Sequence, residues 1–153
     1  MNCSSTKRIQ DPNPALQVIH EELGIPENWA RERDVEYYDE AKVEELELVS
    51  IDFTGKPFVL ARSAVDRWRA LRAAAASENI VLRPFSGFRS YLYQRGLIKN
   101  HLKNGREIND ILCQLAAPGC SEHHTGLAID LTAEDCPPLG EEFENTEAFK
   151  WNV

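Results

Sequence analysis

One loop and the segment after it hold the residues of this sequence that are best suited to binding a metal. His123 lies between Gly119 and Gly126, and Asp130 follows seven positions after the histidine. Imidazole nitrogen and carboxylate oxygen are both zinc ligands, and a catalytic zinc site takes three protein ligands with water in the fourth position. Spacing alone leaves other interpretations, since loop histidines are often solvent-exposed and aspartates often cap turns. The pair offers two of three ligands.

A second polar group lies upstream, in the segment Ser86–Ser90, with Gln94 five positions after Arg89. A guanidinium is planar, permanently charged and matched to a carboxylate, so Arg89 is suited to binding an anionic ligand. An ordinary surface ion pair is the alternative for a single arginine. Ser86 is interpreted as a hydrogen-bonding residue at a strand end, because no base that could activate it is identifiable.

The other histidines and the cysteines fit structural roles better. His20 falls on the first predicted helix and His101 on a polar helix face, while His124 directly follows His123 and cannot easily reach the same metal. No C-x-x-C pair occurs, which argues against a zinc knuckle and a thioredoxin-like motif. We interpret all four cysteines as structural or incidental, and as reduced thiols. They are Cys3, Cys113, Cys120 and Cys136.

The two polar segments resemble those of a known enzyme family. The sequence from Ser121 to Asp130 is similar to the S-x-H-x-x-G-x-A-x-D signature of VanY-type zinc D,D- and L,D-carboxypeptidases. Ser86–Ser90 with Gln94 resembles the S-x-[FY]-R-S-x-x-x-Q segment of the same family. A looser likeness covers almost everything from residue 14 onward. The family shares its fold with lysostaphin-type peptidases and the hedgehog signalling domain.

The resemblance implies a role for each matched residue. His123 and Asp130 are implied to be zinc ligands, and Arg89 is implied to hold the free carboxylate of the substrate's terminal D-amino acid. Gln94 and Ser121 are implied to add hydrogen bonds to the substrate. The implied partner is a murein peptide ending in D-alanine, and the implied reaction is hydrolysis of the bond before that residue.

The last site segment of the family is missing from this sequence. Family members carry an E-P-W-H-like segment after the strand aspartate, and its Glu is the general base and its His the third zinc ligand. Phe149-Lys150-Trp151 resembles the start of the preceding helix, and no Glu-x-x-His follows Asp130. We therefore expect a C-terminally truncated chain without an identifiable catalytic base or third ligand, and with weak zinc binding. The alternatives are a non-catalytic module that binds peptides with a terminal carboxylate, and a non-functional truncated product.

Helices and short strands must position these residues. Helical spacing, together with capping and stop residues, predicts helices over 14–23, 64–76 (capped by Ser63), 91–103 and 107–115. Strand patterns occur over 46–51, 58–60, 80–82 and 127–131, and the first two form a hairpin. Because Pro84 lacks an N–H, 85–88 is expected to be a bent or edge segment. The irregular mixture predicts an α+β fold. The resemblance implies a small antiparallel sheet with helices packed around it, like hedgehog and D-Ala-D-Ala peptidases.

Length and composition set the broad class. The chain has 153 residues, of which 42% are hydrophobic and 27% charged, and this composition is ordinary for a globular protein. We expect one domain over 14–153, incomplete at its C-terminus, after a disordered tail at 1–13. A net charge of -8 gives no electrostatic reason to bind nucleic acid or anionic lipid. No signal peptide or membrane-spanning run is recognisable, so we expect a cytoplasmic protein without nucleic-acid or membrane partners.

Overall fold

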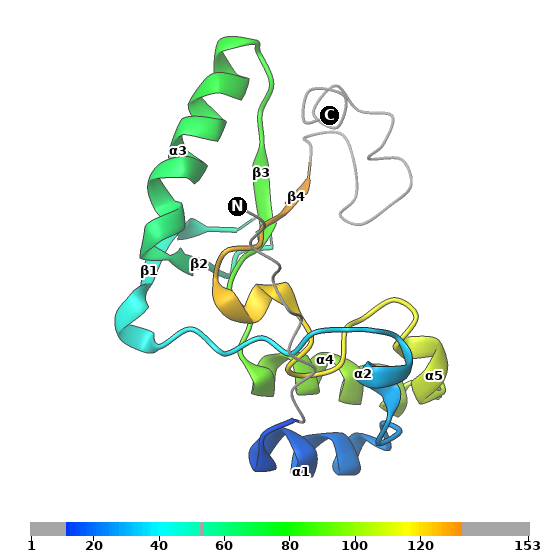
Figure 1. Ribbon diagram of the computed structural model, residues 1–153. Helices are drawn as coiled ribbons and strands as arrows, with labels where there is room; N and C mark the ends of the chain where they lie inside the picture. Colours follow the sequence, from blue (N-terminus) through cyan, green and yellow to red (C-terminus); the bar gives the residue numbers. More distant parts are fainter. Residues whose placement is uncertain (1–11, 53, 133–153) are drawn as a thin grey trace. The chain divides into compact units, whose positions relative to one another are not determined.

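The computed structural model describes residues 12–52 and 54–132 and divides them into two compact units, each built from two separate stretches of chain (Figure 1). The first unit contains the described residues of Met1–Glu40 together with Ser90–His124. The second contains Ala41–Arg89 and the described residues from Thr125 onward. The predicted tail at 1–13, except for its last two residues, and the helix start expected at Phe149-Lys150-Trp151 lie outside the described residues.

The first unit is helical. Its elements are α1 (Pro14–Leu23), α2 (Trp29–Glu32), α4 (Tyr91–Lys103), α5 (Ile108–Ile111) and most of the 3-10 turn η2 (Glu122–Thr125). The side chain of Asn13 caps α1 by accepting a hydrogen bond from the backbone of Leu16, and Gly24 ends it with a φ of 71°. The core of this unit is a buried cluster from all four helices and the loops: Leu23, Ile25, Trp29, Ala30, Ile98, Ile111, Leu112, Ala117 and Cys120.

The second unit combines one long helix with two small antiparallel sheets. The elements are the 3-10 turn η1 (Val43–Glu45), β1 (Leu46–Ile51), β2 (Pro57–Ala61), α3 (Arg62–Ser77), β3 (Arg83–Ser86) and β4 (Asp130–Thr132). Strand β1 pairs with β2, and β3 pairs with β4. Helix α3 lies alongside the β1–β2 hairpin (Figure 1). It buries Val65, Trp68 and Ala75 against Phe58, Leu60 and Leu82.

The fold class is confirmed, since mixed helices and small antiparallel sheets make up the described residues. The hairpin and the helices over 14–23, 64–76 and 91–103 are also confirmed. The predicted strand at 80–82 is wrong, because the paired strand is β3, which starts at Arg83. The helix predicted over 107–115 is a single turn, α5. The cap at Ser63 is wrong too: α3 begins at Arg62, two residues before the predicted start, and its N-cap Ala61 provides no side-chain hydrogen bond.

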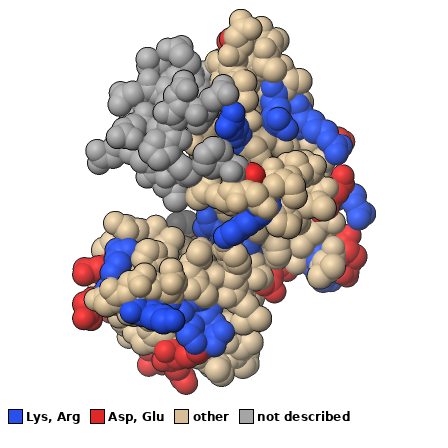
Figure 2. All heavy atoms as spheres, turned by 180° about the vertical axis from the view of Figure 1, so that it is seen from behind, with Lys and Arg blue, Asp and Glu red and all other residues tan. Residues whose placement is uncertain are grey.

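Charged side chains of both signs lie on the surface of the described residues. On the face drawn in Figure 2, basic and acidic side chains are interspersed. In the first unit, for example, Glu22 on α1 bonds both Arg95 and Lys99 on α4. Among the described helices, none is long and apolar enough to cross a membrane.

Candidate functional site

Strand β2 holds both motif segments of the second unit by its backbone. One edge of β2 pairs with β1. On its other edge, the carbonyl oxygen of Val59 accepts a hydrogen bond of 2.8 Å from the N–H of Phe88, and the N–H of Ala61 donates one of 2.9 Å to the carbonyl oxygen of Gly126. Alternate residues of a strand direct their backbone groups to the same edge, so positions 59 and 61 can serve both segments.

Two glycines allow these segments to approach β2 closely. An ideal Cβ at Gly87 would collide with the carbonyl oxygen of Val59 and lie 2.9 Å from the ring of Phe58. An ideal Cβ at Gly126 would lie 2.7 Å from the backbone nitrogen of Ala61, and its φ of +73° is one that L-residues rarely adopt. Glycine is therefore required at both positions by packing, and at Gly126 by backbone conformation as well.

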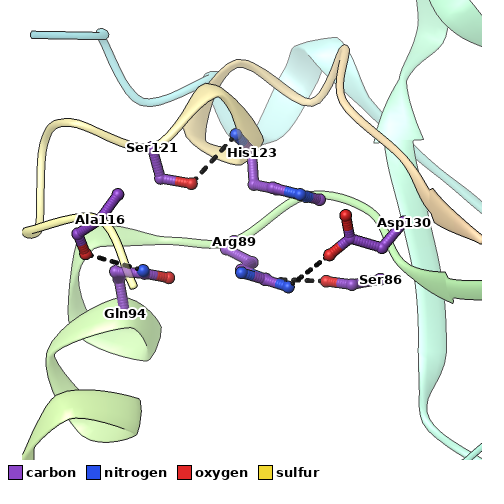
Figure 3. Close-up of polar contacts among 7 residues, drawn as sticks. All are labelled: Ser86, Arg89, Gln94, Ala116, Ser121, His123 and Asp130. Atoms are coloured by element: carbon purple, nitrogen blue, oxygen red, sulfur yellow. Dashed lines mark hydrogen bonds and ion pairs between the residues drawn. The ribbon is translucent and has the colours of Figure 1, made fainter. Parts of the chain in front are cut away.

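Arg89 and Asp130 form an ion pair in the second unit (Figure 3). Nη2 of Arg89 lies 2.8 Å from Oδ2 of Asp130, and Nε donates a 2.8 Å hydrogen bond to Oγ of Ser86. The pairing of β3 with β4 sets this geometry, because Ser86 and Asp130 are opposite each other in the ladder. The side chains of Arg89 and Asp130 are only 12% and 28% exposed. Contacts to two different groups fix the orientation of the guanidinium plane, and Ser86 is confirmed as a hydrogen-bonding residue at a strand end.

Gln94, Ser121 and His123 belong to the first unit. Nε2 of Gln94 donates a hydrogen bond of 2.9 Å to the carbonyl oxygen of Ala116, and the backbone N–H of His123 donates one of 3.3 Å to Oγ of Ser121 (Figure 3). Gln94 and Ser121 are buried. The structure thus brings Arg89 together with Asp130, while His123 lies in the other unit, and its predicted proximity to Asp130 stays a prediction.

The candidate metal ligands are chemically suited to zinc, but they number two, whereas a catalytic zinc site takes three protein ligands. His123 offers an imidazole and Asp130 a carboxylate, both of which zinc accepts. In the described part of the chain, no group of three or more His, Cys, Asp or Glu residues is arranged to hold a metal ion. Cys120, three residues before His123, belongs to the buried core of the first unit, and burial raises the pKa of its thiol to about 12.

Two buried histidines also contact the loop that leads to His123. His20 contacts the backbone of Pro118, and His124 contacts that of Gly119. The structural interpretation of His20 is confirmed, whereas the sequence predicted for His124 only that it does not bind the metal of His123, and this stays a prediction. Their particular partners had no signal in the sequence, since neither contact follows from helical or strand periodicity.

The fold and the two motif segments define a class, and comparison with known proteins identifies it. The family model for VanY, D-alanyl-D-alanine carboxypeptidase, matches residues 58–153, and the chain belongs to this family. The resemblance seen in the sequence is therefore confirmed. The putative carboxypeptidase YodJ of Bacillus subtilis (strain 168) is 29% identical over 150 residues, which cover 94% of this chain and 50% of that protein. The chain thus spans about half the length of this curated relative.

Solved structures support the same fold. The structure of the LdcB LD-carboxypeptidase matches with a TM-score of 0.62 and 28% identity, over 74% of this chain and 54% of that one. VanYB in complex with D-alanine-D-alanine matches with a TM-score of 0.53 and 24% identity, over 74% and 60% of the two chains. The D,D-pentapeptidase VanY in complex with Zn(II) matches with a TM-score of 0.51 and 21% identity, over 72% and 66%. The last two likenesses concern the fold alone.

Proposed function

We propose that this protein is a zinc-dependent carboxypeptidase that removes the terminal D-alanine from peptidoglycan peptides. The observation that carries the proposal is the contact between the two motif segments, where Arg89 pairs with Asp130 and both segments bond to strand β2. Membership of the VanY family supports the reaction class. The LdcB structure concerns peptidoglycan recognition, and the two VanY structures are complexes with D-Ala-D-Ala and with Zn(II). These ligands support the substrate class and the metal.

In this proposal His123 and Asp130 are zinc ligands. Bound zinc supplies an activated water molecule and polarises the scissile carbonyl. Arg89 holds the terminal carboxylate of the substrate, because its charge is permanent and its donors form a planar fork. Ser86 and Asp130 support that role by fixing the guanidinium plane before substrate arrives, which reduces the entropy lost on binding.

Gln94 and Ser121 complete the proposal as residues that hydrogen-bond the substrate. Oε1 of Gln94 has no hydrogen-bond partner among the described residues, so it is a candidate acceptor for a peptide N–H. Both side chains are buried and also bond backbone groups, Gln94 the carbonyl oxygen of Ala116 and Ser121 the N–H of His123. Substituting either residue would therefore change both the proposed substrate contact and a backbone hydrogen bond of the first unit. Arg89 is the better first residue to substitute.

The test measures the release of D-alanine from a peptide ending in D-Ala-D-Ala, with the full chain and added zinc. Release that depends on added zinc and that His123→Ala abolishes is the result that supports the proposal. Arg89→Lys keeps the charge but loses the fork, so it should lower kcat/KM by roughly 10- to 100-fold, the value of a charge-assisted hydrogen bond. The matched control is Arg69→Lys, which changes an arginine of the same unit that is 59% exposed in a loose pair with Glu47.

Three results would count against the proposal. Binding of the peptide without release of D-alanine would favour the non-catalytic module that recognises a terminal carboxylate. Neither binding nor release would reject both functions. An equal loss of activity in Arg69→Lys and Arg89→Lys would show that charge in general, and not the site, is responsible.

A further inference from the structure

The peptide unit that joins Pro118 to Gly119 is held at both ends by imidazole rings. Nε2 of His20 lies 2.7 Å from the carbonyl oxygen of Pro118, and the N–H of Gly119 donates a hydrogen bond of 3.0 Å to Nε2 of His124. His20 is 7% exposed and His124 is 0% exposed, so neither contact competes with bulk water. All four residues belong to the first unit.

The chemistry of the two contacts determines which nitrogen of each ring carries a proton. A carbonyl oxygen only accepts, so Nε2 of His20 must carry the hydrogen. A backbone N–H only donates, so Nε2 of His124 must present its lone pair, and the hydrogen of that neutral ring is on Nδ1. Burial lowers the pKa of His20, which favours its neutral form too. The two histidines are thus opposite tautomers.

We propose that His20 and His124 are positioning residues that fix the Pro118–Gly119 peptide unit, and through it the start of the loop that carries His123. His124, which is next to the candidate metal ligand His123, thus accepts a hydrogen bond from the N–H of Gly119. His20 supplies the complementary donor from helix α1, across 98 residues of sequence.

Other contacts hold the same short stretch of backbone. The carbonyl oxygen of Gly119 accepts a hydrogen bond of 2.7 Å from the N–H of Tyr38, so both polar groups of this glycine are bonded. Gly119 has a φ of +91°, and an ideal Cβ there would lie 2.7 Å from a methyl group of Leu16. The ring of Tyr91 packs edge-on against His124 with centroids 4.7 Å apart. The peptide unit is therefore fixed in one orientation.

The first test needs no substitution and no metal. Long-range 1H–15N NMR spectra of the full-length protein distinguish the two tautomers of each neutral histidine. We expect His124 to carry its hydrogen on Nδ1 and His20 on Nε2. Identical tautomers, reversed tautomers or a rapidly averaged pair would overturn the proposal.

The second test separates the acceptor from the shape of the side chain. His124→Gln retains an acceptor near the position of Nε2, whereas His124→Leu removes it. In His124→Leu the amide hydrogen of Gly119 should lose its exchange protection, and binding of Co²⁺ as a probe should weaken by about tenfold or more, as for other residues that orient metal ligands. Both properties should be restored in His124→Gln. His101→Leu is the control, because the ring of His101 contacts Arg106 and lies outside this loop.

The outcomes distinguish this proposal from the proposed function, on which its consequence for metal binding rests. If the unmodified protein fails to bind Co²⁺, the zinc-dependent function is rejected, and the tautomers and the Gly119 amide still decide the positioning role. If His124→Leu and His124→Gln behave alike, the positioning role is rejected even where Co²⁺ binds. Should His124→Leu fail to fold, the tautomers of the unmodified protein decide.

Discussion

Replacing Gly126 by alanine tests whether close approach to strand β2 holds the second motif segment. The change adds one methyl group at a φ of +73°, 2.7 Å from the backbone nitrogen of Ala61. A left-handed backbone costs an L-residue roughly 1–2 kcal/mol. Overpacking a tight site costs roughly 1–3 kcal/mol. Alanine regains about 0.4–1 kcal/mol by restricting the unfolded chain. We therefore expect a net loss of about 2–4 kcal/mol in the free energy of unfolding.

Two other glycines of the same unit separate these contributions. Gly55 has a φ of +85° with nothing within 4 Å of an added Cβ, so Gly55→Ala reports the backbone conformation alone. Its expected loss is about 0.5–1 kcal/mol. Gly87 has no positive φ but would place a Cβ against Val59 and Phe58, so Gly87→Ala reports packing alone. Its expected loss is about 1–2 kcal/mol.

The assay is urea unfolding followed by tryptophan fluorescence, since Trp68 packs edge-on against Phe58 in the core of the second unit. The midpoint and the slope together give the free energy of unfolding for each variant. The expected order of destabilisation is Gly126→Ala, then Gly87→Ala, then Gly55→Ala. If Gly126→Ala is no worse than Gly55→Ala, the segment does not depend on close contact with β2.

Two further predictions concern the first unit. Bonds to Arg95 and Lys99 lower the pKa of Glu22 from 4.5 to about 2, so its contribution to stability is complete above pH 4.5 and is lost as the pH falls towards 2. Glu22→Gln should therefore lose less stability than the unmodified protein between pH 5 and 3 in thermal melts. Iodoacetamide at pH 8 should alkylate the exposed Cys113 in the native protein and Cys120 only on unfolding, because Cys120 is buried with a pKa of about 12. Peptide mapping by mass spectrometry checks this, and early alkylation of Cys120 would contradict it.

Prediction from sequence succeeded where the residues of an element set its own ends. Helix α1 starts after the cap at Asn13 and stops at Gly24, and both signals are local. Helix α4 has the predicted bounds because Ser90 caps its first turn, with its side chain accepting from the N–H of Tyr93. Local chemistry was sufficient in these cases because the decisive hydrogen bonds join residues three or four positions apart.

Prediction from sequence failed where a segment distant in the chain determines the bounds of an element. Ile80-Val81-Leu82 has the composition of a strand, but the ladder begins at Arg83, because that is where β4 provides a partner more than 40 residues later. Pro84 is part of that ladder and faces Leu131, next to the irregularity that follows it. The apolar composition of this segment correctly indicates that Leu82 is buried. It does not indicate which backbone groups form hydrogen bonds with another strand.

The candidate site divides in the same way. The family resemblance pointed to both Arg89 and Asp130, but no pattern in the sequence indicated that these two residues bond each other. Nη2 of Arg89 and Oδ2 of Asp130 lie 2.8 Å apart at a half-buried position, so each of the two side chains constrains the other. This pairing couples the proposed substrate-binding residue to a proposed metal ligand, which motif matching treats as separate functions.

The register of the hairpin is what allows that pairing. Val59 and Ala61 reach the two motif segments from one edge of β2 only because Leu48 and Leu46 of β1 face them across the other edge. A slip of one residue would turn those backbone groups of β2 away and release both segments at once, since alternate positions point in opposite directions. The irregularity between Leu48 and Ser50 lies beyond the pairs of Leu46 with Ala61 and Leu48 with Val59, so both bonding positions share one register. The β1–β2 alignment therefore supports, from the other side of β2, the β3–β4 ladder in which Ser86 faces Asp130 and Arg89 reaches that aspartate.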